Sequence, residues 1–171
     1  KDLDNKSLLK IINKLKKLNV ESIGVCFLWS TVNPIHENIV AKFLEAKLPG
    51  IPYSLSHKVN PTLREYRRAS STCIDASLKP IMTRYLSNLK IDLEDKGFRG
   101  QFLMVTSQGG VKNVELSANS PIHLINSGPS MAPVGANFYL KKCENNEQAI
   151  VIDLGGTTFD ISLIKNRKIP R

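Results

Sequence analysis

The residues best suited to chemistry lie near the end of the sequence, where Asp153 is followed by Gly155, Gly156, Thr157 and Thr158. Glycines let a phosphate approach the backbone because they lack a Cβ, and their amides, with the two threonine hydroxyls, can donate to phosphate oxygens. A carboxylate at the end of a buried strand can hold a divalent metal ion or its waters beside that phosphate. The pattern is therefore compatible with an anion site, at which Asp153 would be the catalytic and metal-binding carboxylate.

Residues 149–164 have the pattern of a strand, a glycine turn and a second strand. A Walker A loop needs a Gly-Lys-Ser/Thr run, and a Rossmann loop needs three spaced glycines that open a helix, so both are excluded. An ordinary hairpin, in which the glycines permit positive φ and Asp153 accepts backbone hydrogen bonds, explains the same residues. Asp160, in the second strand, either assists the anion site or bonds to the turn. The residues alone leave both interpretations open.

Composition favours a soluble intracellular protein. No run approaches the roughly 18 to 20 apolar residues of a membrane span, and the N-terminal residues lack the apolar core of a signal peptide. The three cysteines are odd in number, widely spaced and outside any C-x-x-C pattern, which predicts neither disulfides nor a zinc site. A cytoplasmic location is therefore expected.

The formal net charge of +9 raises the question of a nucleic-acid partner. The lysines of residues 6–17 fall on the polar face of an amphipathic helix, and the arginines are scattered among acids. Aromatic residues make up 6% of the chain, and none alternates with basic residues as a base-stacking surface requires. We expect a solvated lysine-rich surface, with no nucleic acid and no membrane as partners.

Hydrophobic periodicity predicts alternating helices and strands. The run from Ile23 to Trp29 is continuously apolar, as in a strand covered on both faces, so an α/β fold is expected. The other expected elements are a helix capped by Asp4 or Asn5 and reaching Asn19, a helix from an Asn33 cap to Lys47, a strand at 53–56, a helical region at 61–96, a strand at 101–107 and a short helix from Ser127 to Tyr139. Pro80 predicts a kink or two helices, Gly97 predicts a helix C-terminal cap, and 141–148 is expected to be a linker.

The remaining polar residues favour structural roles. His36, beside Glu37 in a first helical turn, is expected to cap or pack, and residues 64–68 to form an ion-paired helix start. His57 and His123 have no partner at metal-ligand spacing, which is typical of surface or core histidines.

Five motifs, in order along the chain, resemble those of the hydantoinase A / 5-oxoprolinase family. Residues 153–160 resemble its D-[ML]-G-G-T-[ST]-x-D element, and residues 25–37 its C-L-L-[WH]-S-[FY]-x-N-P-x-H-E segment. Residues 64–72 are similar to R-E-Y-E-R-x-S-T-T, residues 107–110 to S-N-G-G, and residues 127–129 to S-G-P. The matches extend over nearly the whole sequence, which we interpret as an internal fragment of such a protein.

This resemblance implies part of the actin-like (ribonuclease H-like) ATPase fold that Hsp70 and sugar kinases share, with a mixed sheet flanked by helices and a β-hairpin at the end of the chain. In that fold the nucleotide lies between two lobes, each of which supplies a glycine hairpin. Residues 1–146 are expected to complete the first lobe, covering the end of the family's N-terminal region and the start of its hydantoinase A region. Residues 147–171 are expected to begin the second lobe.

The resemblance also implies an activity, in which ATP phosphorylates an amide oxygen of a cyclic substrate such as 5-oxoproline or a hydantoin and water then opens the ring. The implied cofactors are ATP and Mg²⁺ or another divalent metal ion, with nucleotide ligands at Gly155, Gly156, Thr157, Thr158 and Asp160. Implied partners are the small cyclic amide and a hydantoinase B (HyuB)-like subunit or domain.

Two alternatives stay open at this point. The first is the nucleotide-using subunit of an acetone-type carboxylase, and the second is a non-catalytic scaffold or interaction fragment. Because half of a cleft cannot enclose a nucleotide, we expect this chain by itself to be inactive and to bind ATP weakly or not at all.

Overall fold

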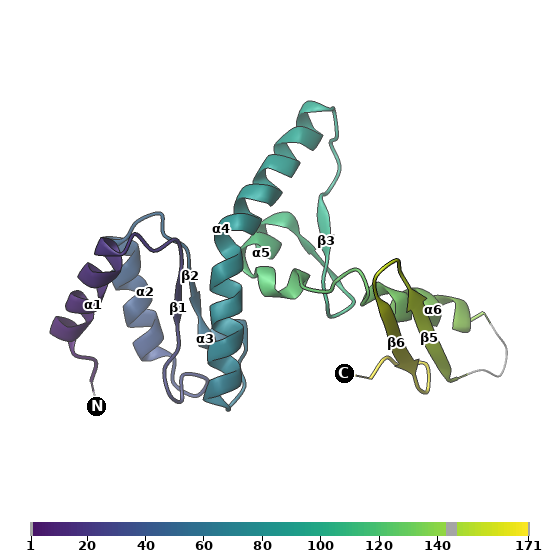
Figure 1. Ribbon diagram of the computed structural model, residues 1–171, viewed down its shortest axis with the longest axis horizontal. Coiled ribbons are helices and arrows are strands. Elements are labelled where there is room, and N and C mark those ends of the chain that lie inside the picture. Colours follow the sequence, from purple (N-terminus) through teal and green to yellow (C-terminus); the bar gives the residue numbers. More distant parts are fainter. Residues whose placement is uncertain (1, 143–146, 171) are drawn as a thin grey trace. The chain divides into compact units, whose positions relative to one another are not determined.

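The computed structural model describes residues 2–142 and 147–170, which fall into two compact units (Figure 1). The first unit contains the described residues up to Arg99 together with Ala118–Ile122. The second contains Gly100–Ser117 and the described residues from His123 onward. The elements of the first ninety-nine residues are α1 (Asn5–Lys17), β1 (Ile23–Val25), α2 (Ile35–Lys47), β2 (Tyr53–Leu55), α3 (Ser56–Val59) and α4 (Glu65–Asp95).

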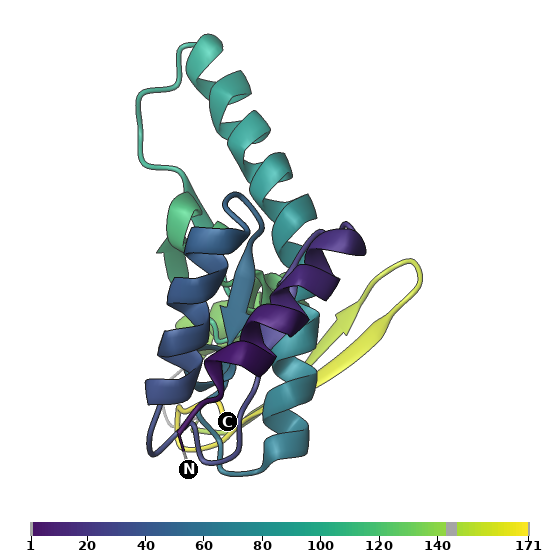
Figure 2. The same cartoon turned by 90° about the vertical axis from the view of Figure 1, so that its left-hand side faces the viewer.

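The first unit is built in layers. The helices α1 and α2 pack on one face of the parallel pair β1–β2, and α4 lies against the other face (Figures 1 and 2). Ile12, Leu44 and Leu55 are buried in the apolar core between these helices and strands. A Cβ on Gly24 would lie 3.5 Å from the Thr72 side chain, so the glycine lets α4 approach β1 closely.

The start of α1 and the end of α4 follow the capping residues that the sequence predicts, whereas the N-cap of α2 is Pro34 and not the predicted Asn33. The Asp4 carboxylate accepts a hydrogen bond from the Lys6 amide at 3.0 Å and caps α1. At the end of α4, Gly97 has a φ of 89°, and its amide donates to the Glu94 carbonyl at 3.0 Å, as in a glycine C-terminal cap. Helix α4 continues through Pro80 as one helix, and its axis changes direction along its length in both views (Figures 1 and 2). No helix in the described part of the chain is long and apolar enough to cross a membrane.

The apolar run from Ile23 to Trp29 does not form one strand, so this prediction was wrong in its extent. Strand β1 ends at Val25, and the chain then turns, with the Val32 amide donating to the Trp29 carbonyl at 3.0 Å. Trp29 adopts a left-handed φ of 56°, and 64% of its side chain is exposed. A hydrophobicity pattern does not reveal this backbone conformation, which bulky residues rarely adopt.

The elements after α4 are β3 (Leu103–Val105), β4 (Val111–Asn113), α5 (Val114–Asn119), the 3₁₀-helix η1 (Pro121–Leu124), α6 (Met131–Leu140), β5 (Ala149–Leu154) and β6 (Phe159–Ile164). The antiparallel pair β3–β4 turns at Gly109, whose φ is 77°. Strands β5 and β6 form the expected hairpin, and α6 packs against it (Figure 1). Of the expected linker, residues 143–146 lie outside the described residues.

The β5–β6 hairpin has two different faces. Val151, Ser162 and Ile164 belong to the face that α6 covers, and Ile164 is fully buried. The apolar side chains of the other face are between 51% and 75% exposed: Ile150, Ile152, Leu154, Phe159, Ile161 and Leu163. The prediction that Asp153 ends a buried strand was wrong for the described chain, because no residue of β5 is buried and Asp153 itself is exposed.

Candidate functional site

The glycine turn connects the two strands of the hairpin. The last strand pair is Leu154 with Phe159, and the Gly155 amide donates to the Thr158 carbonyl at 2.9 Å. Neither glycine has a left-handed φ, so the chain does not need glycine here to reach a positive φ. A Cβ on Gly155 would lie 3.2 Å from the Thr158 hydroxyl oxygen, whereas a Cβ on Gly156 would meet open space.

The turn leaves several hydrogen-bond donors free. Of its four amides, only that of Gly155 donates to a backbone carbonyl within the described residues, which leaves those of Gly156, Thr157 and Thr158 without a backbone partner. All four turn residues are exposed. The predicted anion contact therefore falls on these three amides and the two threonine hydroxyls, rather than on both glycine amides.

Two carboxylates face each other beside the turn. Asp153 and Asp160 occupy directly opposite positions in the antiparallel register, so their side chains lie on the same face of the hairpin. Neither side chain makes a hydrogen bond or ion pair with any residue that the structure describes, and Asp160 does not bond to the turn. Like charges at opposed positions are destabilising, and a cation or a hydrogen-bond donor between them would relieve the repulsion. No group of three or more potential metal-binding side chains occurs in the described ranges, so this pair would need further ligands from outside it.

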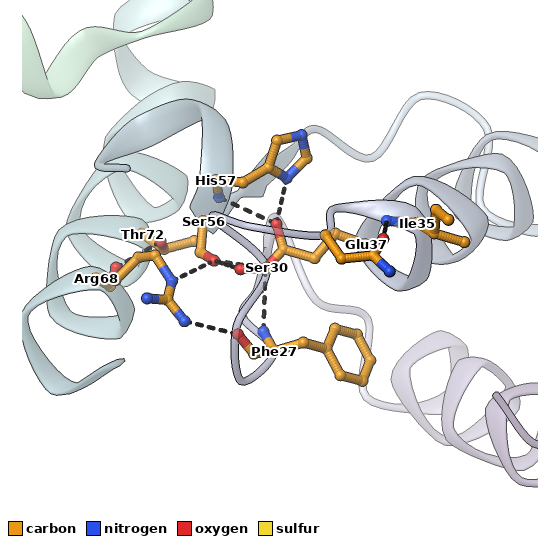
Figure 3. Close-up of polar contacts among 9 residues, drawn as sticks. Phe27, Ser30, Ile35, Glu37, Ser56, His57, Arg68 and Thr72 are labelled. Carbon is orange, nitrogen blue, oxygen red and sulfur yellow. Dashed lines mark hydrogen bonds and ion pairs between the residues drawn. The ribbon is translucent and has the colours of Figure 1, made fainter. Parts of the chain in front are cut away.

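A second polar arrangement lies within the first unit (Figure 3). We call it the Arg68–Glu37 cluster, and its members are Phe27, Ser30, Glu37, Ser56, His57 and Arg68. The side chains of Arg68 and Glu37 are completely buried. Arg68 Nε donates to Ser56 Oγ at 3.0 Å, and Ser56 Oγ donates to Glu37 Oε1 at 2.5 Å, so one hydroxyl connects a buried cation to a buried anion.

The cluster holds together segments that are far apart in the sequence. Arg68 also donates to the carbonyls of Thr62 and Phe27, at 2.7 Å each. The Glu37 carboxylate accepts from the Phe27 amide at 3.0 Å and from His57 Nδ1 at 2.6 Å. Because Ser56 bonds to Glu37 and not to His57, the three side chains do not form the relay that activates a serine nucleophile. The cluster therefore acts as a structural clamp on the turn after β1.

Hydrogen bonding keeps Glu37 ionised despite its burial. Burial raises the pKa of Glu37, but hydrogen bonds from Ser56, from the His57 ring and from the His57 and Phe27 amides outweigh it and lower the pKa below its ordinary value of 4.5. Because the pKa is lower in the folded state, the ionised carboxylate stabilises the fold above about pH 4.5 and loses this effect as pH falls through the folded pKa.

This linkage gives a testable pH dependence. The free energy of unfolding of the chain and of Glu37→Gln, measured in urea between neutral pH and about pH 3, should differ most at neutral pH, with the difference shrinking below about pH 4.5. Glu94→Gln, which changes an exposed carboxylate, serves as the control. A difference that stays constant with pH would contradict the role assigned to the Glu37 charge.

Sequence reasoning missed part of this cluster. His57, which the sequence indicates to be a surface or core histidine, bonds to the Glu37 carboxylate, twenty residues away in the chain. Arg68 forms the expected ion pair at the start of α4, 3.9 Å from a Glu65 oxygen, but its guanidinium is fully buried, which the sequence does not indicate. His36 packs its ring edge-on to Phe27 with centroids 6.0 Å apart, as expected of a packing role. Only the motif at residues 25–37 signals that Glu37 has a specific partner.

Comparison with known proteins identifies the family. Residues 68–171 match the family Hydantoinase/oxoprolinase, and residues 1–48 match the Hydantoinase/oxoprolinase N-terminal region. The chain belongs to the hydantoinase/oxoprolinase family, which confirms the resemblance seen in its motifs.

Two characterised relatives align over most of the chain. It is 32% identical to the caprolactamase subunit alpha of Pseudomonas jessenii over 95% of its length, and 33% identical to the 5-oxoprolinase of Saccharomyces cerevisiae over 93%. It spans only 23% of the first protein and 12% of the second. The chain therefore corresponds to a quarter or less of these relatives.

The fold also matches solved structures. The ATP-dependent caprolactamase from Pseudomonas jessenii superposes with a TM-score of 0.86 at 31% identity, over 95% of this chain and 23% of that one. A nucleotide-free acetone carboxylase superposes with a TM-score of 0.75 at 25% identity, over 97% of this chain and 24% of that one. Both are consistent with the predicted α/β fold of the actin-like ATPase type.

Proposed function

We propose that this chain is part of an ATP-dependent amidohydrolase that opens a cyclic amide through a phosphorylated intermediate. The proposal is supported by family membership and by relatives named caprolactamase and 5-oxoprolinase. The observation that carries it is the exposed turn, whose amides at Gly156, Thr157 and Thr158 have no backbone partner among the described residues. Hydantoins, 5-oxoproline and larger lactams all contain the amide group that this chemistry requires.

The turn fits the role of a phosphate ligand. Successive backbone amides that point in one direction form a concave site for an anion, and the absence of a Cβ at Gly156 leaves space for a phosphate. ATP would supply the phosphoryl group that makes the amide carbon electrophilic. The turn residues would hold the transferred phosphate and neutralise its charge, as amide donors do for oxyanions.

The opposed carboxylates fit a divalent metal ion. Mg²⁺ is bound through one or two protein carboxylates together with phosphate oxygens and water, which suits a pair of acids without a third protein ligand. Asp153 and Asp160 would hold such an ion beside the turn, where it would offset phosphate charge. We retain Asp153 as the catalytic carboxylate of this proposal.

Gly156→Ala separates phosphate binding from folding. A Cβ meets no atom within 4 Å at this position, so the turn should form normally, while the methyl group enters the space that the phosphate requires. In the full-length protein we expect the KM for ATP to rise about tenfold. Gly135→Ala, on helix α6 and also without close neighbours, is the matched control and should leave the KM unchanged. Equal KM values for the two variants would remove Gly156 from the phosphate site.

The decisive assay is ATP hydrolysis that depends on a cyclic amide. The full-length protein should release ADP when hydantoin, 5-oxoproline or caprolactam is added, with formation of the ring-opened product in equal amount. ATP hydrolysis without ring opening, or ring opening without ATP, would contradict the proposal.

The second candidate function is the nucleotide-using subunit of a carboxylase. The superposition on acetone carboxylase favours it, as does 28% identity to the acetophenone carboxylase gamma subunit of Aromatoleum aromaticum. A product that forms only with bicarbonate and a ketone would identify this activity. If neither activity is found and nucleotide does not bind, the scaffold role remains.

Several features of the proposal concern the whole protein. Residues 1–146 would complete the first lobe, residues 147–171 would begin the second, and the chain alone would be inactive.

A hydantoinase B-like partner is supported by the naming of relatives as subunits. A cytoplasmic location agrees with the free thiols of Cys26 and Cys73.

A further inference from the structure

The first unit contains a cavity of about 660 Å³ that the proposed nucleotide chemistry does not use. It lies between the loop after α2, the middle of α4 and residues 118–120. Its size is within the range of small-molecule sites, which are mostly apolar with a few convergent polar groups. Leu48, Ile51 and Val59 contribute apolar lining, and polar groups come from Lys58, Lys79, Glu45 and Tyr53.

One part of the cavity is cationic. The Lys79 ammonium donates to the Tyr53 carbonyl at 2.5 Å and lies 3.6 Å from a carboxylate oxygen of Asp75. Asp75 is fully buried and also accepts hydrogen bonds from Ser54 and from the Ile122 amide. Its carboxylate is therefore held by groups of the protein and does not face the cavity as a free anion. Burial lowers the pKa of Lys79, the attraction of Asp75 opposes this, and the nearby Lys58 lowers it further. An incoming anion would offset the repulsion between the lysines and would stabilise the Lys79 charge that burial disfavours.

The other charged group of the cavity is a carboxylate. The Tyr53 hydroxyl donates a hydrogen bond to Glu45 Oε1. Burial and this carboxylate raise the pKa of Tyr53 to about 12, so the phenol stays protonated. The Tyr53 backbone carbonyl thus contacts Lys79, while its hydroxyl contacts Glu45. The Lys79 ammonium and the Glu45 carboxylate, which both line the cavity, are therefore separated by the length of the Tyr53 residue.

We propose that this cavity binds a small unbranched ω-amino carboxylate, with its carboxylate at Lys58 and Lys79, its ammonium at Glu45, and its methylene chain along the apolar lining. Hydrolysis of an unsubstituted lactam produces both charged groups from one amide bond, so its ring-opened product belongs to this class. The identification of the ligand as a product rests on the proposed function, whereas the binding itself does not.

Calorimetry with three probes tests the charge requirement. The full-length protein, without nucleotide, is titrated with ε-aminocaproate, with caproate, which lacks the amine, and with hexylamine, which lacks the carboxylate. We expect saturable binding of ε-aminocaproate, and binding about tenfold weaker or more for each analogue. Absence of saturable ε-aminocaproate binding, or equal affinity for all three, would overturn the assignment.

Two substitutions then place the ligand in this cavity. Lys58 and Glu45 are both exposed at the cavity surface and outside the apolar core, so Lys58→Gln and Glu45→Gln should fold normally. Each should weaken ε-aminocaproate binding roughly three- to fivefold, as expected for a partly solvated ion pair. Lys42→Gln and Glu94→Gln, which change exposed charges not found in the lining, are the controls. Unchanged affinity in both test variants would overturn the proposal.

The binding experiment and the ATP hydrolysis assay can fail independently, so the cavity assignment and the proposed function are tested separately. Charge-dependent binding in a protein without amide-dependent ATP hydrolysis would support the cavity assignment and remove the link to a product. Amide-dependent ATP hydrolysis without ε-aminocaproate binding would overturn the cavity assignment alone.

Discussion

Replacing Arg68 by Met is expected to lower the free energy of unfolding of the chain by about 3–5 kcal/mol, because it leaves two carbonyls and one buried hydroxyl without their charged donor, at a cost of roughly 1–3 kcal/mol for each group left unsatisfied. The guanidinium is fully buried and donates to Ser56, to the Thr62 carbonyl and to the Phe27 carbonyl. Methionine fills much of the same volume but provides none of these donors. Glu37 would stay buried, and Ser56, which donates to it, would no longer be bonded to a cation.

Urea unfolding followed by circular dichroism measures this loss. The neighbouring Arg67 is exposed, so Arg67→Met is the matched control and should change stability by less than about 0.5 kcal/mol. Arg68→Lys keeps the positive charge but not the planar fork of donors, and an intermediate loss is expected. If Arg68→Met were as stable as Arg67→Met, the cluster could not be the clamp that fixes the turn after β1.

The second large effect is expected at Asp153. In the full-length protein, Asp153→Asn should lower amide-dependent ATP hydrolysis by at least about 100-fold, because it removes a charge that positions the metal ion and the phosphates. The substitution keeps the size of the side chain and relieves the repulsion from Asp160. Its free energy of unfolding should therefore be unchanged or slightly higher.

Measuring both the activity and the free energy of unfolding of Asp153→Asn separates a catalytic role of this carboxylate from a structural role. Asp92→Asn, an exposed substitution on α4, should keep full activity. Lost activity with lost stability in Asp153→Asn would indicate that the carboxylate supports the hairpin instead. Full activity in this variant would exclude Asp153 from the mechanism.

Local signals in the sequence were sufficient for the start of α1, the end of α4 and the hairpin. Asp4 and Gly97 act as caps because capping depends on a few neighbouring atoms, and the strand–turn–strand pattern of residues 149–164 does give two paired strands. Pro80 was compatible with two outcomes, and the structure has one helix. The two caps depend on residues within about one helical turn of each other.

Features that depend on distant partners were not predictable. The turn at Trp29 is fixed by Arg68 and Glu37, whose bonds to Phe27 cross 41 and 10 positions of the sequence. No periodicity encodes such contacts. The exposure of the outer hairpin face was also missed, because an apolar strand pattern does not state which element covers it.

The candidate turn was located correctly as a structural element, but its donors were only partly anticipated. The sequence indicates that glycine amides face an anion, whereas Gly155 uses its amide to close the turn. The opposed positions of Asp153 and Asp160 follow from the register, which a four-residue turn sets and which residue types alone do not define.

A crystal structure of the full-length protein with a non-hydrolysable ATP analogue and Mg²⁺ tests the central claim most directly. The account predicts a phosphate oxygen within about 3 Å of the amide nitrogen of Gly156 or Thr157, at ordinary hydrogen-bond distance. A nucleotide bound elsewhere, with these two amides facing solvent, would contradict it.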